Sequence, residues 1–88
     1  MRIVNARDVG ALVRDRRETL SWSQETLANR SGVSKRWIVA VEAGKAGAQI
    51  GLVLRVLSVL DVELDATVGT GDEGSALDAL LDRLDDRT

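Results

Sequence analysis

The sequence predicts a compact, mainly α-helical domain of four to five helices, with one C-terminal β-strand that pairs across a dimer. Three observations lead to this prediction. Apolar residues recur at helical spacing through most of the first 60 residues, and good helix N-caps stand at Asn5, Ser23 and Ser34. One stretch, residues 61–68, alternates between polar and apolar side chains. A chain of 88 residues has room for one such domain and not for two.

The composition excludes several classes of function. Because the chain has no Cys and no His, it cannot form a disulfide framework or a thiolate zinc site, and it lacks the usual general base. We therefore expect no metal, no cofactor and no enzymatic activity. The sequence also lacks an apolar run of about 18 residues and the apolar region of a signal peptide, so we expect no membrane association and a cytoplasmic location.

Charge is divided unevenly along the chain. Residues 1–45 contain nine Lys or Arg and five acidic residues, a net charge of +4, whereas residues 46–88 contain three Arg and nine acidic residues, a net charge of −6. The first half could therefore face a polyanion, and the second half could not. Both halves could also be ordinary solvated surfaces, so the positions of the basic residues must decide between the two interpretations.

The three N-caps predict helices that begin at residues 6, 24 and 35. We expect the first helix to run to about residue 20 and the second to about residue 30. The second helix stops at Gly32 and the third ends at Gly44, because glycine can take the left-handed conformation that ends a helix without Cβ strain.

A fourth helix is predicted over residues 50–60, which are apolar on most of the helix circumference, so it is either central to the core or shared with a partner subunit. The alternating residues 61–68 predict a strand with one apolar face. A lone strand leaves its backbone unpaired, so we expect it to pair with its own copy across a two-fold axis; an extended tail is the alternative. The candidate dimer contacts are Leu54, Leu57, Val62, Leu64, Ala66 and Val68.

Residues 69–88 differ in composition from the domain that we place at residues 1–68. Residues 69–74 are rich in glycine and acidic residues, as linkers are. A short amphipathic helix is predicted after them, with an apolar face of Leu77, Leu80, Leu81 and Leu84. A helix this short is marginal alone in water, so we expect its face either to bind a protein partner or to pack back on the dimer.

Residues 24–44 contain the most informative pattern. Two short predicted helices are joined by residues 31–34, with Ala28 where the helices approach closely and Gly32 where the turn needs a permissive backbone. The apolar positions expected to be buried are Leu27, Val33, Ile38 and Val41. An ordinary helical hairpin could share any one of these features, but together they are typical of a helix-turn-helix, whose second helix enters the major groove of DNA.

Residues 9–64 resemble the Cro/repressor-type (XRE-like) helix-turn-helix family. The resemblance rests on residues 22–28, WSQETLA, on residues 32–38, GVSKRWI, and on residues 42–45, EAGK. Within that family the sequence is most similar to the HipB-like antitoxins, in the aromatic Trp37 and in residues 51–57, GLVLRVL, followed by the alternating strand. The sequence departs from the common pattern in having no Pro in residues 46–49 and no good N-cap for the fourth helix.

The resemblance implies a role for several residues. The candidate base-reading residues are Lys35, Arg36 and Ala40. Arg can bond to guanine with two hydrogen bonds, and Ala can touch a thymine methyl group. The candidate phosphate contacts are Gln24, Ser34, Trp37 and Lys45. Lys35 and Arg36 could instead be solvated surface charges or contact phosphates only, and Trp37 could be a packing residue. Arg17 and Glu42 match positions that pair to hold the third helix against the body of the domain.

The resemblance therefore implies a dimeric, sequence-specific DNA-binding repressor that places two recognition helices roughly 34 Å apart on a palindromic operator. We expect it to be the antitoxin of a HipA-like kinase toxin, regulating its own operon and residing on the nucleoid when bound to DNA. One alternative is a stand-alone transcriptional regulator without a toxin. Another is a protein-interaction module that uses this fold without binding DNA, because a fold does not fix a function.

Overall fold

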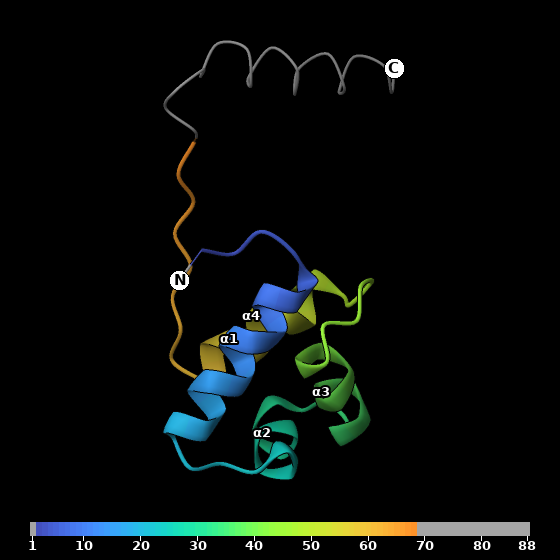
Figure 1. Ribbon diagram of the computed structural model, residues 1–88. Coiled ribbons are helices and arrows are strands. Elements are labelled where there is room, and N and C mark those ends of the chain that lie inside the picture. The colour runs from blue at the N-terminus through green and yellow to red at the C-terminus, as the bar shows by residue number, and fades with distance from the viewer. Residues whose placement is uncertain (1, 69–88) are drawn as a thin grey trace.

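Four helices make up the regular structure of residues 2–68, the part of the chain that the computed structural model describes. They are α1 (Ala6–Thr19), α2 (Gln24–Ser31), α3 (Lys35–Glu42) and α4 (Ile50–Val59). α3 packs against both α1 and α2, and α2 also packs against α4 (Figure 1). The expectation of a mainly α-helical domain is therefore confirmed for this part of the chain.

The predicted N-caps of the first three helices are confirmed. The side-chain oxygens of Asn5, Ser23 and Ser34 each accept a hydrogen bond, at 3.0 Å, from the backbone N–H three residues later. Each bond satisfies one of the N–H groups that a helix start leaves without an intrahelical partner. α4 has no side-chain cap at Gln49, in agreement with the sequence.

Both predicted glycine stops take the left-handed conformation, with φ of 69° at Gly32 and 83° at Gly44. α2 ends directly before Gly32. α3 ends two residues before Gly44, at Glu42, with Ala43 as its C-cap. The backbone N–H of Gly44 then donates to the carbonyl oxygen of Val41. Glycine is favoured at these turns because a Cβ atom strains a backbone with this φ, although Ser21 and Asp61 also take a positive φ after α1 and α4.

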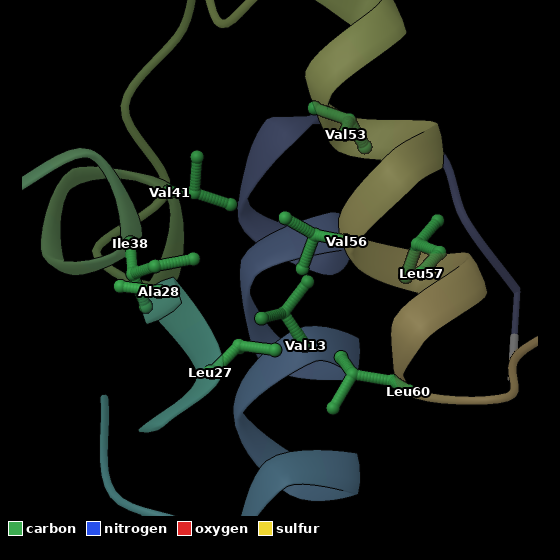
Figure 2. Packing of buried hydrophobic residues seen from close by; sticks show 9 residues of the cluster. All are labelled: Val13, Leu27, Ala28, Ile38, Val41, Val53, Val56, Leu57 and Leu60. Atoms are coloured by element: carbon green, nitrogen blue, oxygen red, sulfur yellow. The ribbon is translucent and has the colours of Figure 1, made fainter. Parts of the chain in front are cut away.

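The buried core cluster is aliphatic, and the partly buried Trp22 and Trp37 pack against it. Figure 2 shows Val13 of α1 lying among Leu27 of α2 and the α4-side residues Val56 and Leu60. The full set of buried hydrophobic residues is Val13, Leu27, Ala28, Ile38, Val41, Val53, Val56, Leu57 and Leu60. All four helices and the turn directly after α4 contribute side chains to this core. The position of α3 is therefore fixed by the same core that holds the rest of the domain.

Gly10 sets the distance between α1 and α3, a role that we did not predict from the sequence. A Cβ atom on Gly10 would collide with the backbone carbonyl oxygen of Val41 and come within 3.0 Å of that of Glu42. Only glycine allows the backbone of α3 to approach α1 this closely, although glycine is unfavourable inside a helix.

The segment after α4 forms no strand within the described residues 2–68. The backbone N–H of Val62 still donates to the carbonyl oxygen of Leu57, and residues 63–68 lie exposed beyond it. A strand needs a neighbouring strand for its hydrogen bonds. The predicted pairing across a dimer therefore stays a prediction.

Two further expectations concern the chain ends and membranes. The predicted apolar face of Leu77, Leu80, Leu81 and Leu84 lies outside the described residues. No helix in residues 2–68 has the length and apolar character needed to cross a membrane.

Candidate nucleic-acid interface

α3 is held by one face and displays the other. Ile38 and Val41 are buried, which fixes the inner face of the helix. Because successive residues of an α-helix are about 100° apart, Arg36 lies near the centre of the opposite face. Lys35 and Arg36 are both exposed, and Ala40 is half-buried one turn further along. The structure thus brings the three candidate base-reading residues to the outer side of α3.

The first turn of α2 lies beside the C-terminal half of α3. Gln24 opens α2, and its side-chain Nε2 donates to Oε1 of Glu42 at the end of α3, at 3.2 Å. An amide nitrogen carries two N–H groups, so this bond fixes the orientation of the amide and leaves it able to donate again. The helix N-terminus adds backbone N–H groups and a partial positive charge. This arrangement suits a phosphate oxygen.

Glu42 is bound more strongly by Arg17 of α1. Arg17 Nε lies 2.7 Å from Glu42 Oε2, and Arg17 Nη2 donates to Glu42 Oε1 at 2.9 Å. Arg17 Nη1 also donates to the carbonyl oxygen of Trp22, at 2.8 Å. The hydrogen bond to Glu42 raises the pKa of Arg17 above its already high ordinary value, despite partial desolvation. The pair implied by the resemblance is thus formed, with two parallel hydrogen bonds and a third to the backbone.

The other candidate phosphate contacts occupy different positions around α3. Ser34 is exposed, and its hydroxyl already accepts the N-cap hydrogen bond, so only its O–H remains for a phosphate. Lys45 is exposed just after α3. Trp37 is half-buried against the core and also lines a groove with Ala40 and Lys45, beneath the loop of residues 46–49. Trp37 is thus a packing residue that also reaches the groove.

Two features of this region were not predicted from the sequence. Val39 of α3 is 44% exposed and lines a second groove together with Arg14, Ser23 and Gln24. Arg30 lies over the ring of Trp22, 4.5 Å from its centroid, in a cation–π arrangement. The position of Val39 could have been found from the sequence, since it follows Arg36 by three residues and therefore shares its side of the helix.

A separate groove lies at the end of α4, where the apolar side chains share the lining with Ser58, Asp61 and Glu63. Leu54 and Leu64 are 48% and 52% exposed, and they line this groove with Val62 and Asp61. Leu57, a candidate dimer contact, is only 2% exposed and belongs to the core. α4 buries the face that carries Val53, Val56 and Leu57, yet Leu57 still lines the groove, so its role as a dimer contact stays a prediction.

A short helix held beside a second one that displays a basic outer face is the arrangement of a helix-turn-helix DNA-binding domain. The chain belongs to this family, since the model of the helix-turn-helix domain family matches residues 8–68. An uncharacterised HTH-type transcriptional regulator from Sinorhizobium fredii, y4mF, is 48% identical over 64 residues, which are 73% of this chain and 84% of that protein. The resemblance noted from the sequence is therefore confirmed.

Solved structures give the same fold. The restriction-modification controller protein C.AhdI from Aeromonas hydrophila matches with a TM-score of 0.61 and 31% identity, over 66% of this chain and 84% of that one. A chain of the HipA-HipB-O2-O3 complex matches with a TM-score of 0.72 and 16% identity, over 80% of this chain and 99% of that one. Because the sequences are only 16% identical, the similarity to the chain of the HipA-HipB-O2-O3 complex supports the fold alone.

Proposed function

We propose that the protein is a dimeric, sequence-specific DNA-binding transcriptional repressor. The observation that carries the proposal is that α3 displays Arg36 on the face opposite its buried residues, while Glu42 at the end of the same helix holds the amide of Gln24. The Arg36 side chain can reach base edges in the major groove, while the Gln24 amide binds the phosphate backbone of the DNA. Both kinds of contact are needed for specific binding.

Sequence discrimination is assigned to α3. Arg36 and Lys35 donate hydrogen bonds to base edges, with guanine as the preferred partner of Arg36, and Ala40 approaches a thymine methyl group. The contacts proposed to hold the DNA backbone are Gln24, Ser34, Lys45 and the indole N–H of Trp37. The positive charge of residues 1–45 attracts the polyanion, and the acidic residues fall mainly in the remainder of the chain.

Dimerisation is assigned to the groove at the end of α4. The exposed side chains of Leu54 and Leu64 gain a partner there, and residues 62–68 of two copies pair as strands. Two copies would then place their α3 helices about one turn of DNA apart, on the halves of a palindrome.

Selection of duplexes from a random pool, followed by sequencing, tests this function. We expect a palindromic site whose half-sites lie roughly 10 base pairs apart, centre to centre. The Arg36→Ala variant should lose preference at one base pair of each half-site. Arg55→Ala removes an exposed positive charge from α4 and is the matched control, for which the selected site should not change. Recovery of no common sequence by the wild-type protein would contradict the proposal.

A finer form of the proposal makes the protein the antitoxin of a HipA-like kinase. Support for this form comes from the HipB-like features of the sequence, Trp37 and residues 51–57, and from the apolar face predicted at Leu77, Leu80, Leu81 and Leu84. Co-purification from host lysate of the full chain, and of a chain ending at Val68, tests it. A stoichiometric kinase-like protein that is lost on truncation is expected.

Recovery of only DNA and further copies of the chain would instead favour the stand-alone regulator. The similarity to C.AhdI, a controller protein, is consistent with that second form. A protein-interaction module would be indicated if DNA binding showed no steep dependence on salt, because a protein that contacts several phosphates releases several counterions.

A further inference from the structure

The outer face of α3 displays one large apolar side chain, that of Val39. Arg36 lies at the centre of this face, and the next turn places Val39 and Ala40 on either side of the Arg36 position, three and four residues further on. Val39 is 44% exposed, whereas Ile38 and Val41, its neighbours in sequence, belong to the core. Val39 therefore contributes little to the core and points to the side from which DNA would approach.

The surroundings of Val39 indicate which side of the interface it faces. It lines the groove between α3 and the start of α2, together with Gln24 and Arg14. Gln24 is the residue to which we assign a phosphate contact. Val39 thus lies between the proposed phosphate contact and the base-reading Arg36, over the region where base edges of the major groove would be exposed.

The chemistry of the major groove limits what an apolar side chain can recognise there. Of the groups that base pairs present in the groove, the C5 methyl group of thymine is the apolar one. A branched aliphatic side chain gains by removing that methyl group from water, and it offers no hydrogen bond to the remaining groups.

We propose that Val39 is a specificity-determining residue that contacts the C5 methyl group of a pyrimidine next to the base read by Arg36. This inference rests on the proposed function, because it requires α3 to lie in the major groove. Thymine is the expected source of the methyl group. 5-Methylcytosine presents the same methyl group. The test distinguishes the two bases, because thymine is replaced by uracil and cytosine is methylated at C5.

The test uses the selected operator with each thymine replaced, one at a time, by uracil, which lacks only the C5 methyl group. In each half-site, one thymine is assigned to Val39. Replacing that thymine by uracil should lower the affinity of the wild-type protein about fourfold, which is the effect of burying about one methyl group. Val39→Ala should bind the unmodified operator more weakly and should no longer respond to uracil at that position. Its response at every other position should remain.

Ala40→Gly provides the matched control, since it should lose the response at a different thymine only. If instead the sensitive position carries cytosine, methylation at C5 should strengthen wild-type binding by about the same factor, and Val39→Ala should not respond. An unchanged uracil profile for Val39→Ala would overturn the inference while leaving the proposed function intact. Failure of the wild-type protein to prefer any operator would overturn both, so the two failures are distinguishable.

Discussion

Arg17 Nε and Glu42 Oε2, 2.7 Å apart, join the last turn of α1 to the last residue of α3. The two side chains are 12% and 5% exposed, so the pair is largely withdrawn from water. Glu42 also accepts the hydrogen bond from Gln24 at the start of α2. One carboxylate thereby fixes three helices relative to one another, at the point where the proposed recognition helix ends.

Breaking this pair should strongly destabilise the domain. Arg17→Ala leaves the Glu42 carboxylate buried without its main partner, and we expect a loss of about 3 kcal/mol in the free energy of unfolding. Urea denaturation followed by circular dichroism measures it. Arg14→Ala is the matched control, because the Arg14–Glu18 pair is 62% and 55% exposed and should contribute less than about 1 kcal/mol. Equal effects of the two substitutions would contradict the assignment.

Gly10→Ala should also destabilise the fold, because the added methyl group would push the backbone of α3 away from α1. We expect a cost of about 1–3 kcal/mol in the same denaturation experiment. Gly51→Ala is the comparison: Gly51 is the second residue of α4, and a Cβ atom there meets nothing within 4 Å. That substitution should stabilise the domain by about 0.5–1 kcal/mol through helix propensity. A neutral Gly10→Ala would mean that α1 and α3 are less closely packed than described.

Dimerisation should be lost when a charge replaces Leu54 in the groove at the end of α4. Leu54→Glu places a charge where the proposed partner copy would bury an apolar side chain, and we expect a monomer by light scattering at micromolar concentration. Ile50→Glu tests the specificity of the effect, since Ile50 is exposed on the same helix but does not line the groove. A dimer that survives Leu54→Glu would place the interface elsewhere.

Lys45→Ala should weaken binding to all DNA sequences by a similar factor, because Lys45 is assigned to a phosphate and not to a base. The slope of log binding constant against log salt concentration should fall by about 1 for each monomer that makes the contact. Gln24→Ala should weaken binding without a comparable change in slope, since Gln24 is neutral. A loss confined to one DNA sequence would instead assign Lys45 to base recognition.

Local signals in the sequence were sufficient to predict most of the fold. The caps at Asn5, Ser23 and Ser34 and the glycines at positions 32 and 44 act within a few residues, so their effects can be predicted without knowledge of the tertiary structure. The role of Gly10 could not be predicted this way, because it depends on the distance between α1 and a helix about 30 residues further along the chain.

The candidate site was predicted less completely. Spacing along α3 places Lys35, Arg36 and Ala40 on its outer side, but burial of Leu57 depends on which face of the almost uniformly apolar α4 meets the core. The interpretation of residues 61–68 as a strand rests on a second copy of the chain. A single sequence contains no signal for the geometry of that copy.

The most direct test of the account is the affinity ratio between the selected operator and a scrambled duplex, measured by fluorescence anisotropy at one fixed salt concentration. The wild-type protein should bind the operator at least about 10³ times more tightly. The variant with Lys35→Ala and Arg36→Ala should retain its fold by circular dichroism, because both side chains are exposed, and its ratio should fall far below the wild-type value. A folded double variant that still discriminated as the wild type does would show that α3 does not read the operator.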